Sequence, residues 1–154
     1  MKVFISSLNV PIGYTTPSFP SLYWPLGHTS SKFSSSLLYY SADVWRFTVL
    51  WFLIAFSGVY VVAAFIASIN YLIYSQRNNY GGKSCFVTIL MIWCTYLTSG
   101  LFIATIGGSV VGLIISAIYK AGSMTMSTWI PFVWALVGVL YDISTSYSNS
   151  SMTL

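Results

Sequence analysis

The feature that most constrains the fold is a run of 36 residues, Ser84 to Tyr119, that contains no charged side chain. A second run of 30 uncharged residues lies between Arg46 and Arg77. One helix that spans the hydrocarbon core of a bilayer needs about 20 apolar residues, and two helices need about 40 plus a turn. The longer run is therefore too long for one ordinary span and too short for two.

Such runs leave few charged residues for the whole chain. The 154 residues include six Lys or Arg and only two acids, Asp43 and Asp142. Charged residues make up 5% of the chain, whereas a soluble domain carries about 25%. So few charges cannot cover a water-facing surface. The sequence therefore predicts an all-α fold, a polytopic bundle of membrane helices.

Composition divides the chain into three regions. The first carries four of the five prolines, a serine cluster and several aromatic residues, which predicts an irregular segment at the membrane interface, with a disordered tail as the alternative. The second is the predicted transmembrane helical domain, and the third is a polar tail. These regions are residues 1–42, 43–147 and 148–154, with spans expected at about 47–74, 84–119 and 128–147.

Small residues recur at every fourth position in the middle of the longer run. On a helix this spacing places them on one face, where another helix can approach closely in lipid. We call this set the small-residue face and expect it to pack against a helix of this chain or of a partner. Its members are Gly100, Ala104, Gly108, Gly112 and Ser116.

The small-residue face also bears on the number of spans. It requires residues 100–116 to be one helix, so a break in the run would leave only residues 84–99 for a separate span, which is shorter than the usual minimum of about 17. We therefore favour three long spans, with four as the alternative. The basic residues do not settle the orientation, because they are divided almost evenly between the two sides.

Charged and aromatic residues at the ends of the spans are expected to anchor the helices at lipid headgroups. They are Trp45, Arg46, Trp51, Arg77, Lys83 and Lys120. These cations are scattered singly, unlike the clustered cations of a nucleic-acid-binding surface, so no nucleic-acid partner is expected. Asp142 lies near the end of the last span, and acids in membrane segments are rare and often functional. An interfacial position for its carboxylate is the alternative.

The residues needed for catalysis are sparse. The single histidine, His28, lies in the N-terminal segment, and the two acids are about a hundred positions apart. Cys85 and Cys94 have neither the spacing nor the neighbours of a metal or redox site. We therefore expect no enzyme activity, no metal and no cofactor, with phospholipid as the bound molecule. A shallow groove lined by hydroxyl groups could still scramble lipids, and the candidate hydroxyls are on Thr95, Thr98, Ser99, Thr105, Ser109 and Ser116.

Three short motifs resemble the transmembrane protein 170 family over about residues 42–145. The stretch DVWRFTVLW at residues 43–51 resembles that family's entry to its first span. RNNYGGK at 77–83 resembles its short basic loop, and IYKAG at 118–122 with IPF at 130–132 resembles the loop before its third span. The second apolar run is longer here than in the family.

The resemblance implies a non-enzymatic protein of the endoplasmic reticulum and nuclear envelope. It implies a role in membrane shape, or one beside a large bridge-like lipid-transfer protein at the end where lipid is taken up. Our leading hypothesis is an accessory subunit that anchors such a partner, in the reticulum membrane or at contact sites, or supplies lipid to it. The alternatives are a membrane-shaping protein that acts through its own hairpin and N-terminal segment, and a small lipid scramblase.

Overall fold

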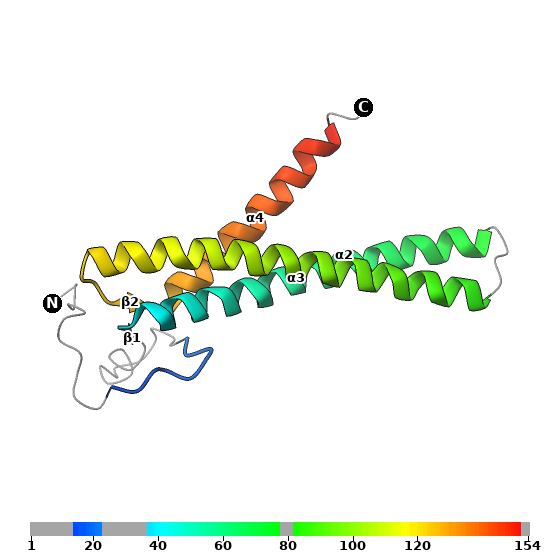
Figure 1. The fold of residues 1–154 in the computed structure, drawn as a ribbon. Helices are drawn as coiled ribbons and strands as arrows, with labels where there is room; N and C mark the ends of the chain where they lie inside the picture. Colours follow the sequence, from blue (N-terminus) through cyan, green and yellow to red (C-terminus); the bar gives the residue numbers. More distant parts are fainter. Residues whose placement is uncertain (1–13, 23–36, 78–81, 152–154) are drawn as a thin grey trace, which may run out of the picture.

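The computed structural model describes residues 14–22, 37–77 and 82–151 (Figure 1). Its elements are β1 (Leu37–Leu38), α2 (Ser41–Arg77), α3 (Gly82–Ala121), β2 (Met126–Ser127) and α4 (Trp129–Ser151). The three helices are each long and apolar enough to cross a membrane. The predicted all-α membrane fold with three spans is confirmed.

Helices α2 and α3 form one long antiparallel hairpin (Figure 1). They have 37 and 40 residues, which correspond to about 55 Å and 60 Å of helix. The uncharged run from Ser84 to Tyr119 is thus part of one unbroken helix. No proline occurs between residues 41 and 121, so nothing in either helix removes a backbone donor.

The helix ends extend beyond the predicted spans. Helix α2 begins inside the region assigned to the N-terminal segment, because the amides of Asp43 and Val44 bond to the carbonyl of Tyr40. Helix α4 continues to Ser151, four residues into the expected polar tail. The boundaries of the predicted spans follow changes in hydropathy, whereas a helix ends where its backbone hydrogen bonds end.

The segment before α2 is tied to the loop before α4. Leu37 pairs with Ser127 and Leu38 with Met126 in a short antiparallel ladder, which sequence analysis did not predict. Leu38 and Met126 are fully buried. They form one apolar cluster with Val44, Phe47 and Ile115, which are also buried. This small core joins the start of α2, the end of α3 and the start of α4.

The described N-terminal residues, 14–22, cover this end of the bundle without forming a helix or strand. The carbonyl of Ser21 accepts a hydrogen bond from Thr128 Oγ1 at 2.9 Å, and the Phe19 ring lies 5.1 Å from that of Trp51. Tyr14 donates its hydroxyl proton to the carbonyl of Leu37 at 3.0 Å. Burial raises the pKa of the Tyr14 phenol, so the hydroxyl remains a donor at neutral pH.

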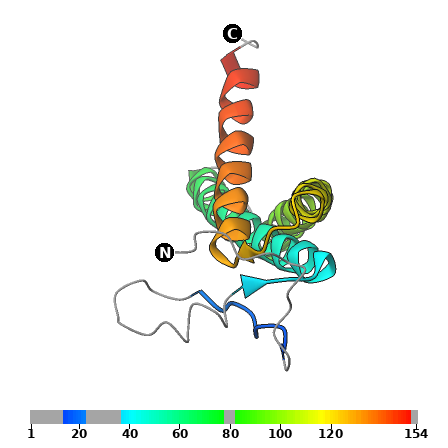
Figure 2. The ribbon, with the colours of Figure 1, turned by 90° about the vertical axis from the view of Figure 1, so that its left-hand side faces the viewer.

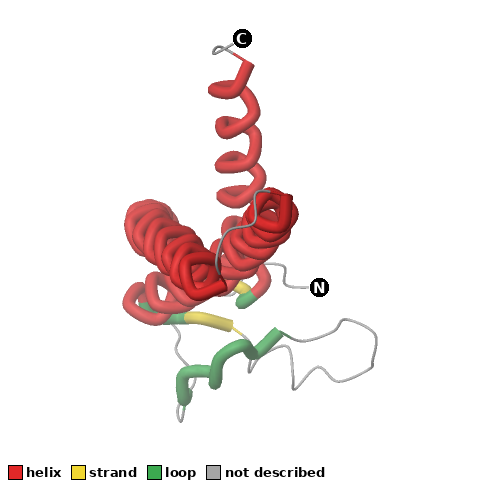
Figure 3. The backbone as a smooth tube through the Cα atoms, turned by 90° about the vertical axis from the view of Figure 1, so that its right-hand side faces the viewer, coloured by secondary structure: helices red, strands yellow, loops and turns green. Residues whose placement is uncertain are grey.

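Helix α4 packs on the first half of α2 and diverges from the hairpin toward its own C-terminus (Figures 1 and 2). Its Pro131 is buried within the first turn, where a helix tolerates proline without losing a hydrogen bond. Ala135 and Val139 of α4 are buried against Phe52 and Phe56 of α2 and Ala104 of α3. Figure 3, seen from the far end of the hairpin, shows the C-terminal part of α4 standing apart from both long helices.

Candidate functional site

The small-residue face lies against α2. Gly100, Ala104, Gly108 and Gly112 are buried, and Ser116 at the end of the row is half-buried. The helix that sequence analysis could not identify is thus the preceding helix of the same chain. This face is used for packing within the hairpin.

The fit at the glycines leaves no room for a side chain. A Cβ atom at Gly108 would lie 2.9 Å from Phe52 Cβ and 3.2 Å from the backbone Cα of Val49. At Gly100 it would lie 2.7 Å from the ring of Tyr60. Distances this short exclude even a methyl group without movement of the two helices.

Phe52 lies where the three helices meet. Its side chain is 2% exposed and contacts glycines on both neighbours, since a Cβ at Gly138 of α4 would lie 2.8 Å from the Phe52 ring. It stacks on Phe56 with the ring centroids 5.7 Å apart. Sequence analysis missed Phe52, because its neighbours in the sequence are also apolar. No sequence pattern indicates which of these apolar side chains lies at the crossing of the three helices.

The expected anchors lie at the helix ends. Trp45, Arg46, Arg77 and Lys120 are exposed, whereas the side chain of Lys83 lies outside the described residues. Trp51 is half-buried, with its ring centroid 4.9 Å from that of Phe132. Trp51 therefore packs between α2 and α4 and does not reach toward headgroups.

Asp142 is half-buried and connects two helices. The hydroxyl of Tyr60 on α2 donates a hydrogen bond to Asp142 Oδ2 on α4 at 3.3 Å. Asp142 lies 13 residues after Trp129, about 20 Å along the helix, so its carboxylate lies in the C-terminal part of the span, near the end of the apolar residues of α4. An acid within a membrane segment is commonly paired with a polar group, and Tyr60 is that group here.

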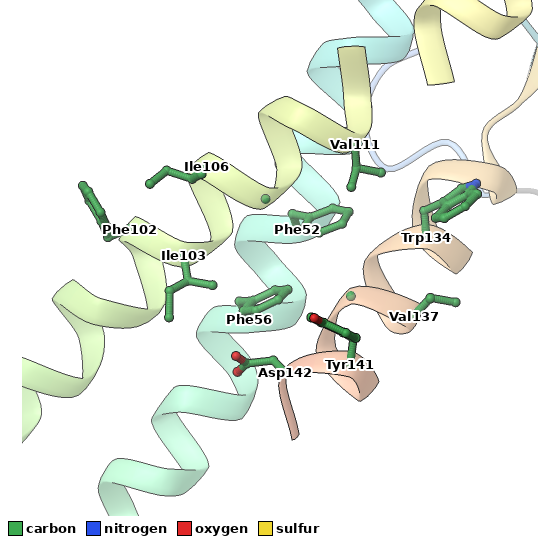
Figure 4. Close-up of a pocket in the computed structure, with 12 residues that line it drawn as sticks. Phe52, Phe56, Phe102, Ile103, Ile106, Val111, Trp134, Val137, Tyr141 and Asp142 are labelled. Carbon is green, nitrogen blue, oxygen red and sulfur yellow. The ribbon is translucent and has the colours of Figure 1, made fainter. Parts of the chain in front are cut away.

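A groove opens between α3 and α4, with α2 as its floor (Figure 4). We call it the α3–α4 groove; its volume is about 570 Å³. Phe52 and Phe56 form the floor, Ile103 and Ile106 line the α3 side, and Trp134 and Val137 line the α4 side, with Asp142 at one end. Apart from that carboxylate the lining is almost entirely apolar.

The candidate hydroxyls do not line this groove. Thr95, Thr98, Ser99 and Thr105 each donate to a carbonyl three or four residues earlier in α3. Such bonds satisfy the hydroxyl within its own helix, which is how helices tolerate these residues in lipid. Ser116 lines a separate cavity of about 50 Å³ beside Tyr119 and Lys120.

A further polar contact joins the two hairpin helices. Trp93 Nε1 donates to Ser68 Oγ at 3.0 Å, and Ser68 in turn donates to the carbonyl of Ala64 at 2.7 Å.

Among the residues that the structure describes, no three His, Cys, Asp or Glu side chains come together as metal ligands. Cys85 and Cys94 are free thiols.

Comparison with known proteins identifies one family. The family model described as Transmembrane protein 170A/B-like matches residues 37–154. Protein YPR153W of Saccharomyces cerevisiae is 38% identical over 148 residues, which cover 96% of each chain. No solved structure matches the chain.

Proposed function

Because this chain belongs to the transmembrane protein 170A/B-like family, we propose that it is a non-enzymatic accessory subunit of the endoplasmic reticulum membrane. It anchors a large lipid-transfer protein, at contact sites or the nuclear envelope, and supplies lipid to it. The observation that carries the proposal is the excess length of the α2–α3 hairpin. The open groove beside Asp142 supports the lipid-supplying part.

The hairpin is longer than a bilayer requires. At the average tilt of about 20°, a core of about 30 Å is crossed by about 21 residues of helix. The residues Trp45 and Arg46 at one end of α2, and Lys120 at the end of α3, hold that end of the hairpin at one membrane surface. The opposite end of the hairpin then extends past the other surface by several turns.

This projecting end, the hairpin tip, is formed by residues 69–77 and 85–91. Beside the exposed polar residues Asn70, Gln76 and Arg77, it exposes many large apolar side chains, which are Ile69, Leu72, Ile73, Tyr74, Phe86, Val87, Leu90 and Met91. A contiguous apolar surface outside the bilayer marks an interaction site. A lipid-transfer protein offers a matching apolar surface and would bring its lipid path to the membrane at that point.

A photo-cross-linker tests this assignment. With p-benzoylphenylalanine in place of Phe86, 68% exposed at the hairpin tip, irradiation of intact cells should join this chain to a large protein. The matched control is Leu113, which is 62% exposed on the same helix but lies seven residues before Lys120, within the bilayer. There the cross-linker should react with lipid only.

The same pair of positions can contradict the proposal. If neither position yields a protein adduct, and the purified chain alone transfers fluorescent phospholipid between leaflets after reconstitution, the chain is a scramblase and not an accessory subunit. If an adduct at Phe86 forms with a protein whose removal leaves lipid distribution unchanged, the hairpin tip serves another purpose.

A further inference from the structure

The α3–α4 groove has the dimensions and lining of a ligand site. Its volume of about 570 Å³ lies within the range of about 300–1,000 Å³ that small-molecule sites occupy. Phe102 and Tyr141 on its rim are 68% and 71% exposed, so the groove is open to its surroundings. Because α3 and α4 are spans, those surroundings are lipid, and acyl chains are the apolar molecules present there.

The short apolar part of α4 brings headgroups near the end of this groove. Its large apolar residues lie between Trp129 and Ile143, a stretch that includes Asp142 and measures 15 residues or about 22 Å, against a hydrocarbon core of about 30 Å. Ser144, Thr145 and Ser146 follow, and any tilt only shortens the distance that α4 crosses. A bilayer adapts to a short apolar helix by thinning locally. Headgroups of the leaflet at the C-terminal end of α4 are therefore drawn toward Asp142.

The charge at that end is uncompensated. Tyr60 supplies one neutral hydrogen bond to Asp142 Oδ2, and no Lys or Arg lines the groove. No salt bridge to this carboxylate occurs within the described part of the chain. A carboxylate in apolar surroundings attracts a cationic group and repels an anionic one more strongly than it would in water. The ammonium of a zwitterionic phospholipid has the complementary charge.

We propose that the α3–α4 groove binds one zwitterionic phospholipid, with an acyl chain over Phe52 and Phe56 and the headgroup ammonium at Asp142. This deepens the proposed function, on which it rests, by naming the class of lipid that the chain supplies. The site is formed by a single chain, so it can be tested without any partner protein.

Gly107 offers a substitution that fills the groove and spares the packing. A Cβ there meets only the Phe52 ring, at 3.7 and 3.8 Å, which are ordinary contact distances. Gly107→Leu therefore places its side chain in the groove without separating α2 from α3. Val137→Trp fills the same volume from α4, so a folding defect in either variant leaves the other as the test. The control is Gly58→Leu, since nothing lies within 4 Å of a Cβ at Gly58.

The measurement is lipid retention by the purified full-length chain. Each variant is reconstituted in nanodiscs with equal amounts of palmitoyl-oleoyl phosphatidylcholine and phosphatidylglycerol, extracted into mild detergent and examined by native mass spectrometry. Wild type and Gly58→Leu should each retain one phospholipid, with phosphatidylcholine favoured about fivefold. Gly107→Leu and Val137→Trp should lose this lipid, and Asp142→Asn should keep a lipid but lose the preference.

Two results would overturn the inference. One is wild-type lipid retention in both groove-filling variants when their thermal unfolding matches that of wild type. The other is equal retention of the two lipids by the wild-type chain. If no protein adduct forms at Phe86 but the purified chain still prefers phosphatidylcholine, the proposed function fails and the lipid site stands. Failure of the proposed function and failure of this inference are therefore distinguishable.

Discussion

At the scale of single residues, two adjacent glycines have opposite surroundings. Gly108 is closed off by Phe52 and the backbone of Val49, whereas Gly107 borders open space. The recurrence of small residues at every fourth position predicts a packing face that includes Gly108 and leaves out Gly107. It does not predict the groove, because the groove depends on where α4 crosses, and no local pattern specifies that crossing.

Substitution of two glycines tests whether the small-residue face holds α2 and α3 together. Gly108→Leu combined with Gly112→Leu should insert in the membrane, since leucine favours insertion by about half a kcal/mol per residue. Packing should fail, because a Cβ at Gly112 would lie 3.0 Å from Trp45 and 3.3 Å from Thr48, and overpacking costs about 1–3 kcal/mol per site. Thermal unfolding in mild detergent measures the loss. Gly58→Leu should unfold like wild type, and a double variant as stable as wild type would show that this face does not hold the hairpin together.

For Asp142, the sequence predicts that the residue is unusual but does not predict its hydrogen-bond partner. An acid inside an apolar segment stands out in the sequence, because burying a charge in lipid is unfavourable. Its partner, Tyr60, does not stand out, since it is 82 positions away and one of twelve tyrosines. The pairing depends on the crossing of α2 and α4 and becomes visible only in three dimensions.

At the scale of elements, the long uncharged runs predict the two long helices well. Lipid leaves every backbone group dependent on an internal partner, so an apolar run of this length must be helical. The β1–β2 ladder could not be predicted in the same way. It involves two residues on each strand, too few for an alternating pattern, and its paired residues are 90 and 88 positions apart.

Because the apolar part of α4 is short, we expect water to reach the residues that follow Ile143. With Cys85 and Cys94 replaced by alanine, Ser144→Cys should react with a membrane-impermeant maleimide added to the side that holds the C-terminus. Leu136→Cys, two turns earlier on the same helix, should not react, although its side chain is 43% exposed in the structure. Equal protection of both cysteines would mean that the bilayer keeps its full thickness along α4.

At the scale of the whole molecule, helices of unequal apolar length share one bilayer. The hairpin exceeds the hydrocarbon core, whereas the apolar residues of α4 that end at Ile143 fall short of it. Helix α4 runs obliquely from the β1–β2 end in the general direction of the hairpin tip, and its C-terminal end lies away from the hairpin, level with its middle (Figure 1). Apolar surface would therefore project from the membrane on the side where α4 thins it. A partner docked on the hairpin tip would thus be on the same side of the membrane as the headgroups that are drawn inward.

The most direct test of this account is a cryo-electron microscopy map of the complex isolated from native membranes in mild detergent. The hairpin tip, residues 69–77 and 85–91, should project beyond the detergent belt and be covered by an elongated protein with an apolar groove. Lipid density should occupy the α3–α4 groove on the same side. A map in which the hairpin tip is bare, or lies wholly within the belt, would contradict the account.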